Sequence, residues 1–158
     1  TGAACDRAHS VLHPTGLHTM TSPLPAPLAA WHEVVRSRDM RRLAALLHDD
    51  VVFHSPVVHT PQRGKAITTA YLTGALHVLN NASFRYEREV VGSNDAVLEF
   101  FTEVDGIVIN GVDLIRWDEG GQIVDFKVMV RPLKAMNMLH QKMAEMLERL
   151  KAGSGPAA

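Results

Sequence analysis

The sequence predicts an α+β domain in which a curved sheet wraps around helices. Up to residue 79 the hydrophobic residues recur mostly at helical spacing, and beyond it they alternate with a period of two. The alternating segments are joined by Gly92-Ser93-Asn94-Asp95, Asp105-Gly106 and Glu119-Gly120-Gly121, which supply the residues that tight antiparallel turns need. Helices that precede such a meander are typical of α+β domains, and a strongly bent sheet leaves a hollow beside them.

Three helices are expected before the meander, each with one apolar face. The first begins at Leu28, the second is capped by Asp39, and the third runs over Lys65–Leu79 until Asn80 and Asn81 end it. Their apolar faces consist of Leu28, Trp31, Val34 and Val35, then Met40, Leu43, Leu46 and Leu47, then Ile67, Tyr71, Ala75 and Val78.

Five strands and a last helix complete the expected order. A short edge strand covers Val51–Val58, where Val51, Phe53 and Ser55 share one face, and it is ended by prolines. The four strands of the meander are expected at residues 83–91, 96–104, 107–117 and 123–131. Pro132 opens the last helix, whose apolar side carries Leu133, Met136, Leu139, Met143, Leu147 and Leu150.

Composition excludes several classes of function. The 158 residues contain 16 Lys and Arg against 17 Asp and Glu, so the chain lacks the positive field that nucleic acid attracts, and nucleic acid is not expected as a partner. No apolar run approaches the roughly 20 residues of a membrane helix, so we expect no membrane association and a cytoplasmic protein. The one cysteine, Cys5, has no partner for an internal disulfide, and the nine histidines show no metal-ligand spacing, so neither a metal site nor a cofactor is expected.

One domain is expected, with a tail at each end. Residues 1–27 mix Gly, Pro, Ser, Thr and His without periodicity, which predicts a disordered leader. The domain then covers residues 28–151, and residues 152–158 form a flexible tail.

Alternation assigns an inner and an outer face to the strands. The inner residues, together with one residue of the third helix, are the expected lining of a ligand pocket: Phe53, Tyr71, Leu98, Phe100, Thr102, Ile109, Ile115, Phe126, Val128 and Val130. The outer face keeps apolar residues at Phe101, Val112, Leu114 and Met129, which are explained either by a homodimer through the sheet or by the last helix covering them.

Asp113 is the one acid on the inner face of its strand, because Ile109, Gly111 and Ile115 share that face. Burial of a carboxyl among apolar side chains raises its pKa, so a neutral Asp113 could donate a hydrogen bond and polarise a carbonyl. The structural alternatives are a bond to a helix-end amide, a pair with Arg116 or His77, or a face assignment that is off by one.

The segments Asp49-Asp50-Val51-Val52-Phe53-His54-Ser55-Pro56-Val57 and Val112-Asp113-Leu114-Ile115-Arg116-Trp117 resemble the nuclear-transport-factor-2-like superfamily, in its SnoaL-like and ketosteroid-isomerase-like branch. The resemblance covers residues 28–130 and implies a cone-shaped α+β barrel with a curved mixed sheet around three helices, to which this chain adds a C-terminal helix. It also implies a small, mostly apolar ligand or substrate.

The resemblance assigns roles to three residues. Asp113 falls on the protonated aspartate of the oxyanion hole, a carboxylic acid that the apolar site of ketosteroid isomerase is known to keep neutral. Trp31 falls on the oxyanion-hole tyrosine, and its indole N–H can still donate. Ser55 falls on the catalytic aspartate and is too weak a base to replace it, so true steroid isomerisation is not expected. His59, in a loop, is the candidate for a replacement base, whereas His54 faces the other way.

Other chemistries of the superfamily lack a residue here as well. The Asp–Arg–Asp set of limonene-epoxide hydrolases would need an acid where Val128 stands, and a SnoaL-type cyclase would need an inward histidine. Three hypotheses follow: an enzyme of isomerase, cyclase or hydrolase type with Asp113, Trp31 and Ser55 in its site, a module that binds an apolar ligand without changing it, or a dimerisation module. A cavity too small for any ligand would favour the last.

Overall fold

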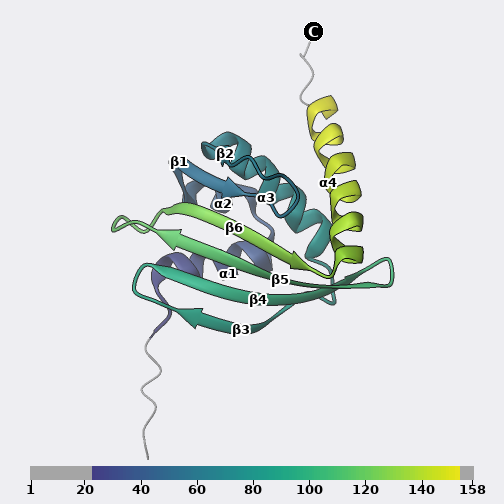
Figure 1. The fold of residues 1–158 in the computed structure, drawn as a ribbon. Helices are drawn as coiled ribbons and strands as arrows, with labels where there is room; N and C mark the ends of the chain where they lie inside the picture. Colours follow the sequence, from purple (N-terminus) through teal and green to yellow (C-terminus); the bar gives the residue numbers. More distant parts are fainter. Residues whose placement is uncertain (1–22, 154–158) are drawn as a thin grey trace, which may run out of the picture.

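A computed structural model describes residues 23–153 as an α+β domain, as predicted (Figure 1). Of the predicted leader and tail, the structure describes residues 23–27 and 152–153, and the rest lie outside the described residues. Within the described part the elements are α1 Ala26–Ser37, α2 Met40–Leu46, β1 Leu47–His54, β2 Gln62–Arg63, α3 Lys65–Leu79, β3 Arg85–Val91, β4 Asp95–Val104, β5 Ile107–Trp117, β6 Ile123–Arg131 and α4 Leu133–Gly153.

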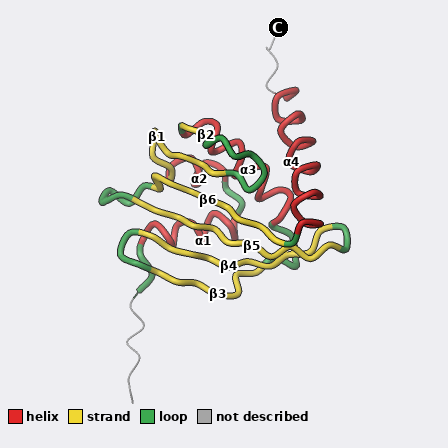
Figure 2. The backbone as a smooth tube through the Cα atoms, viewed as in Figure 1, coloured by secondary structure: helices red, strands yellow, loops and turns green. Residues whose placement is uncertain are grey.

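The strands form one mixed, curved sheet in the order β2-β1-β6-β5-β4-β3. All neighbours pair antiparallel except β1 and β6, which are parallel. The helices α1, α2 and α3 lie on one face of this sheet, and α4 rises beside α3 from the end of β6 (Figures 1 and 2). The expected order of helices, meander and final helix is confirmed.

The first strand differs from its prediction. It runs over Leu47–His54 instead of Val51–Val58, and it lies one place in from the edge because β2 pairs with it on its outer side. Leu47 is fully buried at its start, and the strand ends where the Ser55 hydroxyl accepts a hydrogen bond from the backbone N–H of Val57. The two residues of β2 are too few to show alternation, so no sequence pattern indicates this strand.

The helices begin and end close to the predicted residues. The first starts two residues early, at Ala26, and the predicted cap is present, since the Asp39 carboxylate accepts from the Arg41 backbone N–H. α3 has the predicted bounds, but its buried face is rotated, so that Ile67 is 38% exposed. Its buried members are Thr68, Leu72, Gly74, Leu76 and Leu79. The last helix begins at Leu133 and continues to Gly153, two residues into the predicted tail.

The meander confirms the predicted faces. Residues of β4, β5 and β6 that alternation placed inward are buried against the helices, among them Leu98, Phe100, Ile109, Ile115 and Phe126. β5 and β6 have the predicted bounds, whereas β3 starts two residues later and β4 one residue earlier than predicted.

The outer face of the sheet is not covered by α4, so that explanation of its apolar residues is wrong. The last helix packs against α3 and the ends of β5 and β6. Of the apolar residues expected on this face, Met129 is 52% exposed and the others are half-buried, namely Phe101, Val112 and Leu114. Val90 and Val97 on the same face are 61% and 38% exposed. No helix in the described part of the chain combines the length and apolar character that a membrane crossing requires.

Gly111, on β5, leaves room for the ring of Phe100, its partner on β4, to lie against its backbone. A Cβ at this position would lie 2.3 Å from Phe100 Cζ and 2.8 Å from the carbonyl oxygen of Met129. We expect Gly111→Ala to lower the free energy of unfolding by about 1 to 3 kcal/mol, because a buried ring and backbone must shift. Urea unfolding measures this, with Gly120→Ala in the β5–β6 turn as the control, where the nearest atom is an Asp118 oxygen at 3.3 Å. Equal effects of the two changes would contradict the packing argument.

Candidate functional site

Asp113 lies in the middle of the sheet and faces the helices. Its backbone pairs with Leu98 on β4 and with Val128 on β6. The residue is 6% exposed, so the predicted inward orientation is confirmed. Neither suggested basic partner reaches it, since Arg116 is exposed and His77 bonds to the carbonyl oxygen of Thr73.

A tyrosine that the sequence reasoning missed connects Asp113 to Trp31. The hydroxyl of Tyr86, on β3, donates a hydrogen bond to Asp113 Oδ2 over 2.8 Å. The same hydroxyl oxygen accepts a bond from Trp31 Nε1, on α1, at 2.9 Å. The two residues assigned to the oxyanion hole by resemblance therefore meet on the oxygen of a third side chain.

Burial sets the protonation of this network. It raises the pKa of Asp113 to about 7, against the opposing effect of the hydrogen bond from Tyr86. Burial, followed by the negative charge of Asp113, raises the pKa of Tyr86 well above its ordinary value. Tyr86 therefore stays a donor, while Asp113 changes between acid and carboxylate near neutral pH.

A small cavity of about 40 Å³ adjoins the network. It is lined by apolar side chains of α1, α3 and the sheet in addition to Asp113, Tyr86 and Asn80. The Trp31 and Phe126 rings meet edge to face in its wall, with centroids 4.8 Å apart. Since one water needs roughly 10 to 15 Å³, the free space takes only a few water molecules.

A second cavity, of about 20 Å³, lies on the other side of Val128. Ala75, Leu79 and Val128 belong to the walls of both cavities, and α4 closes the second one with Leu139 and Met143. The two spaces are neighbouring parts of one barrel interior.

The residues expected in the pocket are divided among several places. Trp31, Phe100, Phe126 and Val128 line the cavity at Asp113, whereas Phe53, Ser55 and Tyr71 line the second cavity, again with Val128. The remaining members of the expected lining lie in neither: Leu98, Thr102, Ile109, Ile115 and Val130. The first four are buried in the core, and the Thr102 hydroxyl donates to the carbonyl oxygen of Leu79 at the end of α3.

Ser55 and His59, the two candidates near the mouth of the barrel, are not placed to take a proton from a ligand at Asp113. The Ser55 hydroxyl accepts from the backbone N–H groups of Val57 and Val58, at 3.1 and 3.4 Å. His59 is exposed and lines a depression on the outside of the barrel. His54 faces outward, with Nε2 3.0 Å from Asp125 Oδ2.

Tyr86 could have been found from the strand pattern. Phe84 and Tyr86 alternate at the start of the expected strand, which places both on its inner face. The signal is weak because the other residues of β3 are exposed and the pairing register shifts between Tyr86 and Arg88.

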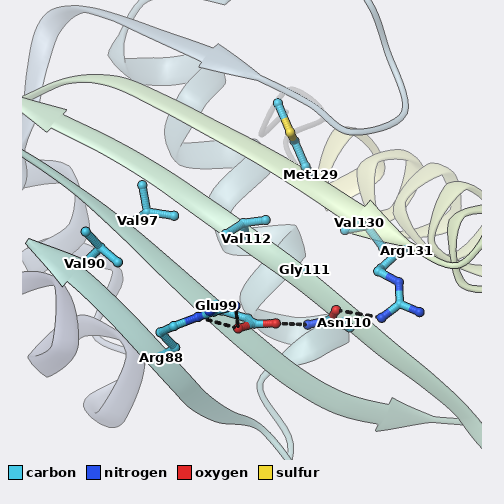
Figure 3. Close-up of a pocket in the computed structure, with 10 residues that line it drawn as sticks. All are labelled: Arg88, Val90, Val97, Glu99, Asn110, Gly111, Val112, Met129, Val130 and Arg131. Carbon is cyan, nitrogen blue, oxygen red and sulfur yellow. Dashed lines mark hydrogen bonds and ion pairs between the residues drawn. The ribbon is translucent and has the colours of Figure 1, made fainter.

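The outer face of the sheet carries a groove of about 410 Å³. Figure 3 shows a row of hydrogen-bonded polar side chains across four strands, formed by Arg88, Glu99, Asn110 and Arg131. Apolar side chains of Val90, Val97, Val112 and Met129 lie beside this row (Figure 3). The hydrogen bond from Arg88, and next that from Asn110, lowers the pKa of Glu99.

No three side chains of His, Cys, Asp or Glu gather into a metal site within residues 23–153. The titratable side chains among the walls of the cavity at Asp113 are Asp113 itself and Tyr86, and Trp31 adds an indole N–H donor.

Comparisons with known proteins identify the family and the fold. Residues 28–126 match the model of the SnoaL-like domain. A steroid delta-isomerase of Pseudomonas aeruginosa is 38% identical, with a TM-score of 0.75 over 80% of this chain and 93% of that one. An uncharacterised protein of Silicibacter pomeroyi with a cystatin-like fold is 34% identical, with a TM-score of 0.72 over 77% and 85% of the two chains.

An NTF2-like protein of unknown function from Cytophaga hutchinsonii shares the fold, with a TM-score of 0.52 at 14% identity over 69% of this chain and 90% of that one. No curated protein sequence matches the chain. The chain belongs to the SnoaL-like domain family and has the nuclear-transport-factor-2-like fold.

Proposed function

We propose that this chain binds a small, mostly apolar molecule inside the barrel and holds an oxygen of that molecule at Asp113. The observation that carries the proposal is a 6% exposed carboxyl, with a pKa of about 7, beside a cavity whose other walls are mainly apolar. A few polar groups in an apolar lining are the usual composition of a small-molecule site.

The polar groups suit an oxygen of the ligand. Protonated Asp113 donates to a carbonyl or ether oxygen, and the Trp31 indole N–H is a second donor that never gives up its proton. Two donors that converge on one oxygen in a dry site stabilise negative charge on it. Any isomerase, cyclase or hydrolase reaction at this site would depend on that polarisation.

The interior offers no general base for steroid isomerisation. Ser55 stands where the resemblance places the catalytic aspartate, and its hydroxyl accepts bonds from the backbone. Among the described residues, no histidine, lysine or second carboxylate lines either cavity. We therefore propose binding with polarisation of an oxygen by Asp113, in which Ser55 orients the ligand, and not the reaction named for the Pseudomonas relative.

The outer face of the sheet supports a second proposal, a homodimer formed through it. Met129 and Val90 are more than half exposed beside the groove, and no other part of the described chain covers them. A two-fold axis through this face would bring the same apolar side chains of a second copy against them, which is how isologous dimers bury such a surface.

Asp113 makes stability depend on pH. The folded chain keeps its proton up to about pH 7, whereas the unfolded chain releases it near 3.8, so folding takes up a proton between these values. The free energy of unfolding is expected to fall as pH rises from 4 to 8, by at most about 4 kcal/mol, because each pH unit is worth about 1.4 kcal/mol. Urea unfolding at several pH values measures this. Asp113→Asn should flatten the profile and the exposed Asp95→Asn should not, whereas a wild-type profile in Asp113→Asn would contradict the assignment.

Binding of a small ketone tests the proposed function. Cyclohexanone is expected to bind more weakly as pH rises through about 7, because ionised Asp113 cannot donate to a carbonyl. NMR titration of the Trp31 indole N–H signal follows this, with Trp117 as the internal reference. Asp113→Asn keeps a donor and should bind equally at every pH, and Asp113→Leu should bind at least tenfold more weakly. Wild-type affinity in Asp113→Leu would show that Asp113 is not the anchor.

Sedimentation velocity tests the dimer. The wild-type chain is expected to sediment as a dimer and Met129→Glu as a monomer, because the new charges would be buried against each other. Ile67→Glu is the matched control, since Ile67 is an exposed apolar residue on α3, away from the outer sheet face. A monomeric wild-type chain would end this proposal.

A further inference from the structure

The position between Trp31 and Asp113 is already occupied by an oxygen of the protein. The Tyr86 hydroxyl lies 2.9 Å from Trp31 Nε1 and 2.8 Å from Asp113 Oδ2. It accepts from the first and donates to the second. A ligand oxygen held by the same two groups would have to lie where the Tyr86 oxygen lies now.

The volume of the cavity also indicates that Tyr86 occupies the place of a ligand. About 40 Å³ is open beside the network, whereas an apolar cavity that binds benzene measures about 150 Å³. A ring-sized ligand therefore cannot enter while the Tyr86 ring is in place. Outward rotation of this side chain would free a space of the size and shape of a phenol, because the tyrosine side chain is itself a phenol.

Tyr86 is the member of the network that is able to move. It belongs to β3, which lies at one edge of the sheet and pairs on one side only, and the other residues of this strand are all exposed. The register of the β3–β4 pairing shifts directly after it. Trp31 and Asp113, at 3% and 6% exposure, are held by α1 and by the central strand β5.

The aromatic contacts of the Tyr86 ring lie at the edge of the barrel, whereas its inner side packs against the hydrophobic core. The ring meets Phe84 and His32 edge to face, with centroids 5.2 and 5.4 Å away, and both of these residues are partly exposed. His32 is in turn held by Glu89, with Nε2 3.2 Å from Oε2. Rotation of Tyr86 would cost these two edge contacts, its packing against the hydrophobic core and its two hydrogen bonds, part of which a bound ring would replace.

We propose that Tyr86 holds the place of the ligand oxygen and is displaced by a small ring that carries a hydroxyl, so that Tyr86 selects such ligands. This inference rests on the proposed function and narrows its ligand class. A hydroxyl can accept from Trp31 and donate to Asp113, which restores both bonds that Tyr86 gives up. A hydrocarbon restores neither, and a carbonyl restores both only while Asp113 is protonated.

The other charged groups do not replace Asp113 in this exchange. In the part of the chain that the structure describes, Tyr86 is the only other titratable side chain among the cavity walls, which α1, α3 and the sheet supply. His32 and Glu89 lie against the Tyr86 ring or beyond it. Binding of a hydroxylated ring should therefore persist above pH 7, where binding of a ketone weakens.

Phenol and toluene, which differ by a hydroxyl in place of a methyl group, are the probes for the test. The chain has two tyrosines, so ring-labelled tyrosine gives separate NMR signals for Tyr86 and for Tyr71, which lines the neighbouring cavity. Phenol is expected to move the Tyr86 ring signals toward solvent-exposed values, and toluene at the same concentration is not. Tyr86→Ala should bind phenol at least tenfold more tightly than the wild type, equivalent to about 1.4 kcal/mol, and should also bind toluene.

The results that overturn the inference are distinct from failure of the proposed function. Phenol binding to the wild type with the Tyr86 ring unmoved, or binding to Tyr86→Ala no tighter than to the wild type, would show that Tyr86 is a fixed wall. Where Tyr86→Ala does not fold, Tyr86→Phe replaces it, and we expect at least threefold tighter phenol binding because two hydrogen bonds no longer hold the ring. Absence of both phenol and cyclohexanone binding in every folded variant would overturn the proposed function itself.

Discussion

The carboxyl of Asp113 is buried in a sheet whose inner face is otherwise mostly apolar, and the chemistry of the interior depends on how that burial is compensated. An unpaired carboxylate there would be costly, so the group either keeps its proton or needs a donor. Tyr86 supplies the donor and Trp31 supports Tyr86, which joins α1, β3 and β5 through one oxygen. Burial still dominates, and it leaves the pKa of Asp113 at about 7.

The same network fills the space that a ligand would use. Two cavities of about 40 and 20 Å³ remain on either side of Val128, far below the several hundred Å³ of ordinary ligand pockets. A fixed interior of this size would favour a dimerisation module. The displacement of Tyr86 that we propose would instead make this interior a binding site that is closed until a suitable oxygen enters.

The steroid delta-isomerase and this chain are similar in fold, but a shared fold does not imply a shared reaction. The 38% identity and the TM-score of 0.75 over four fifths of the chain show a shared family and fold. The role of the acid on β5 in an oxyanion hole is what the resemblance implies and what we propose. By resemblance Ser55 stands where the family has its proton-shuttling aspartate, and our proposal therefore assigns no proton transfer to this position. A fold of this kind supports different chemistries because a few inward side chains decide each of them.

The sequence by itself determined the α+β class, the meander and the inward position of Asp113, because a period of two fixes which face of a strand each residue takes. It also located α3 and the cap of α2, which depend on neighbours along the chain. Only the tertiary structure decided the parallel pairing of β1 with β6, the open outer face of the sheet and the position of Tyr86 between Trp31 and Asp113. These features depend on residues that are far apart in sequence. A local pattern of hydrophobic residues does not predict the distances between them or the volume of the cavities that they enclose.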